Sequence, residues 1–76
     1  MEIPEDAVKA LQAYDRADAE WLRLALELLT GNASRAALRQ AGAVRDHLLA
    51  ELWDLPWWET VDPLTAYVAL RRAARA

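Results

Sequence analysis

The side chains that could do chemistry are few in this chain, and they stand far apart. His47 is the only histidine, Ser34 is the only serine, and cysteine is absent. Zinc requires three or four ligands, and a hydrolytic nucleophile requires a base within hydrogen-bond reach. On one helix, Ser34 and His47 would lie about three and a half turns apart. We therefore expect no catalytic residue, no metal site and no cofactor, and we expect that the protein is not an enzyme.

Acidic side chains gather near the end of the second predicted helix, at Glu51, Asp54, Glu59 and Asp62. Paired carboxylates can transfer protons or bind a hard cation. Their spacing does not match a calcium-binding loop, and the Glu-x-x-His pattern of di-iron bundles is absent. Helix capping explains Asp54 and Asp62, and we interpret the others as surface charges.

Tryptophan is frequent, and three of the four tryptophans fall between Trp53 and Trp58. A tryptophan offers a large apolar area and one N–H donor, which suits binding surfaces. Trp57 and Trp58 are adjacent, so we expect that only one of them enters the core. Trp53, Trp58 and Tyr67, with His47 at the edge, could instead line a pocket for an apolar or aromatic small molecule. The plainer alternative is that tryptophan fills the core in place of the absent phenylalanine.

Composition limits the classes of protein that this chain can belong to. Its 76 residues suffice for one small domain, spanning residues 1–76. The net charge of −3 argues against binding to nucleic acid or to an anionic membrane surface. No stretch approaches the roughly 18 apolar residues of a membrane span, and the acidic start is unlike a signal peptide. Because cysteine is absent, we expect a cytoplasmic protein.

The abundance of alanine, leucine, glutamate and arginine favours helix, and alternating strand patterns are absent. Gly31 is expected as a left-handed cap of the first helix, and Asn32 as the N-cap of the second. Asp62 and Pro63 begin the third helix. In the apolar link before it we expect a short helical turn around Trp57. The sequence thus predicts an all-α fold with helices over about residues 4–29, 33–54 and 63–75.

The short link between the first two helices predicts a long antiparallel hairpin. We call the end with this link the loop end, and the other end the open end. The third helix is expected to run back over residues 41–54 and the start of the first helix, and it is too short to reach the loop end. There the first helix is apolar except at Arg23 and Glu27. An exposed apolar patch indicates an interface, so we expect a four-helix core formed by dimerisation.

The expected partner interface combines apolar residues near the loop end with two tryptophans of the link, namely Trp21, Leu22, Leu26, Leu29, Trp57 and Trp58. The partner would be a second copy, in a homodimer, or another protein. We thus expect a small helical protein–protein interaction module, such as an adaptor, an inhibitor or an accessory subunit. In the alternative monomer, a bent first helix or the tryptophan-rich link covers the patch.

Two other functions remain open from the sequence. One is a helical bundle that binds an apolar or aromatic small molecule near the tryptophans. The other is a dimeric DNA-binding regulator, which would need Arg35, Arg39 and Arg45 on one exposed face. Gly42 could then mark the turn of a helix-turn-helix. The helical pattern continues through Gly42, which argues against a helix-turn-helix at this position.

Overall fold

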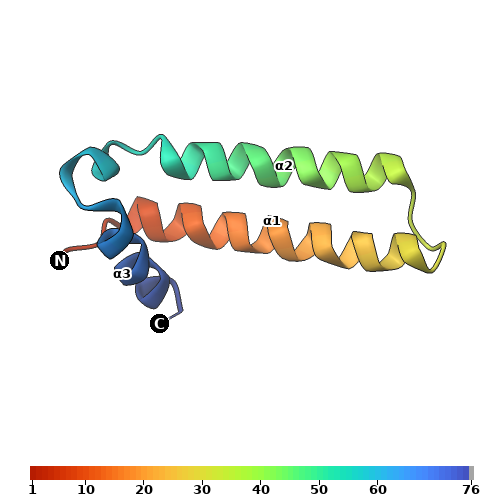
Figure 1. Cartoon of the computed structure of the whole chain (residues 1–76), viewed down its shortest axis with the longest axis horizontal. Coiled ribbons are helices and arrows are strands. Elements are labelled where there is room, and N and C mark those ends of the chain that lie inside the picture. Colours follow the sequence, from red (N-terminus) through yellow and green to blue (C-terminus); the bar gives the residue numbers. More distant parts are fainter. Residues whose placement is uncertain (76) are drawn as a thin grey trace.

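The computed structural model describes residues 1–75, which form an all-α fold (Figure 1). Three α-helices follow one another along the chain: α1 (Glu5–Leu29), α2 (Arg35–Trp53) and α3 (Pro63–Arg75). A short 3-10 helix, η1 (Pro56–Thr60), links α2 to α3. The helices α1 and α2 form a long antiparallel hairpin, and α3 packs against the beginning of α1. The predicted hairpin with a short third helix is confirmed, as is the helical turn around Trp57.

The hairpin turns at Gly31, as predicted. Gly31 has a φ of 79°, a left-handed conformation that only glycine adopts without strain. Its N–H donates to the carbonyl of Leu28 at 3.1 Å, and the N–H of Asn32 donates to the carbonyl of Glu27 at 2.8 Å. This pair of hydrogen bonds is a Schellman motif, which satisfies the last carbonyls of α1 and reverses the chain.

The start of α2 differs from the prediction, because Ser34 and not Asn32 is its N-cap. The Ser34 hydroxyl accepts a hydrogen bond from the N–H of Ala37 at 3.0 Å. Asn32 is occupied by the preceding Schellman motif, so the cap moves two residues along the chain. From there α2 is continuous through Gly42 to Trp53. The break at Gly42 that a helix-turn-helix would need is therefore not formed.

The start of α3 agrees with the prediction. The side chain of Asp62 accepts a hydrogen bond from the N–H of Thr65 at 3.0 Å, and Pro63 is the first helical residue. This contact lowers the pKa of Asp62, because the backbone donor stabilises the carboxylate form. Asp62 thus fixes the point at which the chain turns from η1 into α3.

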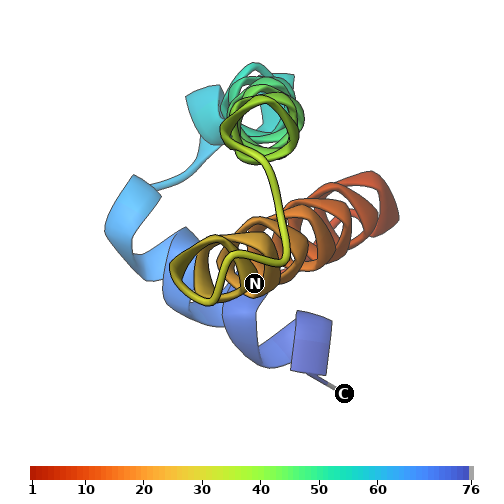
Figure 2. The same cartoon turned by 90° about the vertical axis from the view of Figure 1, so that its right-hand side faces the viewer.

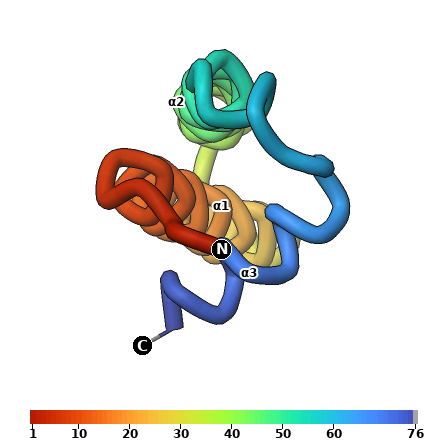
Figure 3. Tube along the Cα trace, turned by 90° about the vertical axis from the view of Figure 1, so that its left-hand side faces the viewer, coloured from red at the N-terminus to blue at the C-terminus, as the bar shows by residue number. Residues whose placement is uncertain are grey.

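The hydrophobic core lies at the open end, where α1, the end of α2, η1 and α3 meet (Figure 3). Six side chains are buried there, namely Ala7, Leu11, Leu52, Trp58, Ala66 and Leu70. They come from all four helical elements, so this cluster holds the fold together. No residue beyond Leu11 on α1 is buried.

The path of α3 differs from the prediction, because α3 packs mainly on α1 and does not run back along α2. Arg71 of α3 binds Asp15 of α1, with 2.6 Å between Nη1 and Oδ2. The side chain of Gln12 donates to the carbonyl of Ala74 at 3.1 Å. The link through η1 carries the chain past the end of α2, so α3 begins beside α1 (Figure 3).

The molecule is elongated, with principal extents of 46 × 23 × 18 Å. Its radius of gyration is 14.7 Å, whereas a compact domain of this length has about 11 Å. Seen from the loop end, α1 and α2 project toward the viewer and α3 lies behind (Figure 2). The loop half of the hairpin therefore consists of two helices that no third helix covers.

Candidate interaction surface

Three leucines form an exposed row on the loop half of α1. Leu22, Leu26 and Leu29 are 54%, 60% and 84% exposed. Their spacing of four and three residues places them on one side of the helix. We call these three residues the leucine stripe. The structure thus leaves exposed the three leucines that the sequence singles out as partner contacts.

The leucine stripe continues the side of α1 that α3 covers at the open end. Leu29 follows Leu11 by 18 residues, which is five helical turns, so the two side chains point in the same direction. Leu11 is buried in the cluster that contains Ala66 and Leu70 of α3. The same helix face is therefore covered in its first half and open in its second half.

Trp21, the fourth expected contact at the loop end, is half-buried within the hairpin. Its indole packs on Gly42 of α2, where an added Cβ atom would lie only 3.3 Å from the ring. The guanidinium of Arg45 lies over the ring at 4.5 Å from its centroid, and Asp18 is 3.9 Å from the same guanidinium. Trp21 is thus a contact between α1 and α2, and a partner contact by the part of its ring that stays exposed remains a prediction.

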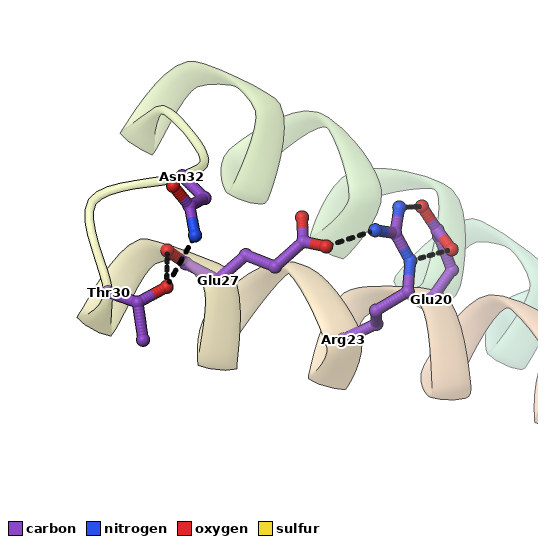
Figure 4. Close-up of polar contacts among 5 residues, drawn as sticks. All are labelled: Glu20, Arg23, Glu27, Thr30 and Asn32. Atoms are coloured by element: carbon purple, nitrogen blue, oxygen red, sulfur yellow. Dashed lines mark hydrogen bonds and ion pairs between the residues drawn. The ribbon is translucent and has the colours of Figure 1, made fainter.

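A charged network runs along α1 beside the leucine stripe (Figure 4). Arg23 binds Glu20 one turn before it and Glu27 one turn after it, with 2.7 Å between Nη1 and the Glu27 carboxylate. The Glu20 side chain raises the pKa of Arg23, and Arg23 lowers that of Glu20. These charged side chains bind one another within α1. The leucines beside them are exposed to solvent and are therefore the part of this surface that a partner could cover.

Of the two tryptophans of the link, only one is buried in the core, as the sequence predicts. Trp58 is only 9% exposed, and its Nε1 donates to the carbonyl of Leu52 at 2.7 Å. Trp57 is half-buried against the core. Trp58 is therefore a core residue, which corrects its assignment as a partner contact, whereas a partner contact at the half-buried Trp57 stays a prediction. The tryptophan with a large exposed area is Trp53, at 46%.

An apolar hollow of about 350 Å³ lies between the end of α2 and the start of α3, lined by Trp53, Pro63, Leu64 and Tyr67. The rings of Trp53 and Tyr67 stack with 6.5 Å between their centroids. Two of the four predicted pocket residues thus meet here, and Trp58 lies beneath Trp53 with 4.4 Å between centroids. Pro63 and Leu64 are not among the predicted pocket residues, although Leu64 and Val68 are an apolar pair at helical spacing.

The fourth predicted pocket residue, His47, lies apart from the hollow. Its side chain is exposed, and its Nε2 is 2.7 Å from the carboxylate of Glu51 one turn along α2. Among residues 1–75 no group of three or more His, Cys, Asp or Glu side chains could hold a metal ion. In the same residues no helix is both long and apolar enough to span a membrane. Neither a family model, nor a curated protein, nor a solved structure matches this chain.

Proposed function

We propose that the protein is a helical protein–protein interaction module that binds a partner α-helix along the leucine stripe. One observation carries the proposal: Leu22, Leu26 and Leu29 are exposed on the helix face that α3 covers elsewhere. A row of apolar residues at four- and three-residue spacing is the surface that a helical partner recognises. Contiguous exposed apolar patches mark interaction sites more often than isolated apolar residues do.

The size of the stripe indicates a modest contribution to affinity. Full burial of one exposed leucine contributes roughly 1.5–3 kcal/mol. With the observed exposed fractions, the three leucines together contribute on the order of 4 kcal/mol. That corresponds to roughly millimolar affinity before the partner's own apolar surface is counted and before the entropic cost of association. The partner must therefore supply an apolar face of its own.

The proposal is tested with two synthetic peptides of identical composition. In one, leucines at helical spacing form a stripe with glutamine flanks, and in the other the same leucines are scattered. The striped peptide should bind the wild-type chain, as measured by fluorescence anisotropy, and should not bind the Leu26→Glu variant. Leu26 is 60% exposed, so this variant should keep the fold, which circular dichroism checks. Equal binding of both peptides, or no binding of either, would contradict the proposal.

A second copy of the chain is one candidate for the partner. Two hairpins that pair through their leucine stripes would form the four-helix core expected from the sequence. The molar mass would then rise to twice 8.6 kDa as the concentration increases, and Leu26→Glu would return it to the monomer value. Sedimentation equilibrium distinguishes this homodimer from a chain that waits for a different protein.

A second function is favoured by the hollow at Trp53, Pro63, Leu64 and Tyr67. We propose as the alternative that it binds an apolar or aromatic small molecule, since its lining is apolar and includes two stacked aromatic rings. A ligand there should change the fluorescence of Trp53 independently of protein concentration. If Trp53→Phe leaves that change intact, this alternative is wrong.

A further inference from the structure

The leucine stripe shares its side of the hairpin with two arginines of α2. Arg35 precedes Trp53 by 18 residues, which is five helical turns, so both point in the same direction. The ring of Trp53 stacks on Tyr67 of α3, so this direction is the side where α3 packs. Arg39 follows Arg35 by one turn and lies close to the same line. Since the leucine stripe also lies on the α3 side of α1, leucines and arginines border the same uncovered surface.

Three of the eight arginines bind carboxylates within residues 1–75, and five do not; Arg35 and Arg39 are the two of these five that lie beside the leucine stripe. Arg23, Arg45 and Arg71 each bind a carboxylate of the chain. Arg35 and Arg39 are exposed, and neither forms an ion pair with any of residues 1–75. Two uncompensated positive charges thus stand beside the apolar row, in a chain whose net charge is negative.

Their position runs against local helix electrostatics. Arg35 is the first residue of α2, whose first turn contains no acidic residue. The N-terminal end of a helix carries a partial positive charge, so a cation there is unfavourable and an anion is favoured. Helices α1 and α3 follow this preference with Glu5 and Asp6 in the first turn of α1 and Asp62 at the start of α3. A local preference that is broken at an exposed surface points to a use outside the fold.

We infer that the partner of the leucine stripe is an amphipathic helix with acidic residues along one flank, which bind Arg35 and Arg39 while its apolar face covers Leu22, Leu26 and Leu29. The inference rests on the proposed function and names the chemistry of its partner. Acidic side chains would complement both arginines and the positive end of α2. The apolar face would cover the part of α1 that α3 does not reach.

Charge also favours this partner over two other occupants. Where the two stripes pair antiparallel, about a twofold axis that runs across α1, both α2 helices lie on the same side of the joint. The arginine pairs of both copies would then lie near one another, where like charges repel. Nucleic acid would engage the arginines but would leave the leucine stripe exposed, because phosphate contacts involve no apolar surface.

The test compares three peptides that carry the same leucine stripe and differ in their flanks, which are glutamine, glutamate or lysine. At low salt the glutamate peptide should bind about tenfold more tightly than the lysine peptide, and the difference should shrink as salt is added. The double variant Arg35→Glu, Arg39→Glu should reverse the preference. The matched control is the double variant Arg72→Glu, Arg75→Glu, which makes the same change in net charge on exposed residues of α3. This control should keep the preference for the glutamate peptide.

Each other outcome has a definite meaning. If all three peptides bind equally and Leu26→Glu abolishes their binding, the acidic partner is wrong and the interaction module stands. If none of them binds and the chain stays monomeric, both proposals fall. A molar mass that doubles with concentration makes a second copy the occupant and overturns the acidic partner. So does tighter binding of a DNA duplex than of the glutamate peptide, if Leu26→Glu leaves the DNA affinity unchanged.

Discussion

Trp58 stabilises the open end with both its ring and its N–H group. Its ring contacts Trp53 and Trp57, with centroid distances of 4.4 and 4.9 Å. Its Nε1 donates to the carbonyl of Leu52 at 2.7 Å, so the indole is buried without an unpaired donor. Phenylalanine could fill part of this volume but could not make that hydrogen bond. The side chain therefore serves the fold and not a partner.

Replacement of Trp58 by alanine should remove a large share of the total stability. The change leaves a cavity in the core and removes the buried hydrogen bond to the Leu52 carbonyl, and should cost about 3–5 kcal/mol. A chain of this length has roughly 4–11 kcal/mol in all. Trp53→Ala is the matched control. Because Trp53 is 46% exposed, this substitution should lower the free energy of unfolding clearly less than Trp58→Ala does. Urea unfolding followed by circular dichroism measures both, and equal costs would contradict the assignment of Trp58 to the core.

Asp62 should make the fold sensitive to acid. The N–H of Thr65 holds the pKa of Asp62 below its ordinary value of 3.8, so the folded state binds this proton less readily than the unfolded state. Asp62 therefore contributes to the free energy of unfolding at pH values above its ordinary pKa. This contribution is lost as the pH falls through the lowered pKa of the folded state. Asp62→Asn keeps a capping side chain that does not titrate. Between about pH 5 and pH 2, wild type should therefore lose more stability than this variant, and parallel losses would refute the role of Asp62.

Among the elements, the order of the helices and most of their limits follow from local signals, whereas the start of α2 and the arrangement of the helices follow only in part. Gly31, Asp62 and Pro63 act on residues beside them, so the sequence suffices to predict the turn and the start of α3. The side on which α3 packs is fixed by contacts between residues far apart in the sequence, such as Asp15 and Arg71, which are 56 residues apart. No periodicity in either helix reports such a pair.

The turn at Gly31 offers a test at this scale. Gly31→Ala should destabilise the fold by about 1 kcal/mol, because the left-handed conformation crowds the added Cβ atom against its own backbone. Beyond Gly31 and its two chain neighbours, no atom of residues 1–75 lies within 4 Å of that position, so a clash with the surroundings cannot explain the loss. Gly42→Ala is the control. Alanine raises the helix propensity at this position, but its Cβ atom would lie only 3.3 Å from the ring of Trp21. The two effects oppose each other, so the stability should change little. A Gly31→Ala variant as stable as wild type would refute the Schellman turn.

At the scale of the whole molecule, stability and the proposed binding occupy different ends. The buried residues lie at the open end, whereas the leucine stripe lies on the projecting half of the hairpin. Helix lengths and loop lengths were enough to predict that the third helix cannot reach that half. They were not enough to separate Trp57 from Trp58, because adjacent residues give no periodic signal. They also did not show that Trp21 packs into the space left by Gly42.

The measurement that tests the leucine stripe most directly is a backbone NMR titration of the labelled chain with the glutamate-flanked peptide. The largest shift changes should fall on residues 22–29 of α1 and 35–39 of α2, and the open end should change little. The Leu26→Glu variant should lose these changes. Shift changes centred on Trp53, Leu64 and Tyr67, or no changes at saturating peptide, would contradict the leucine stripe as the binding surface.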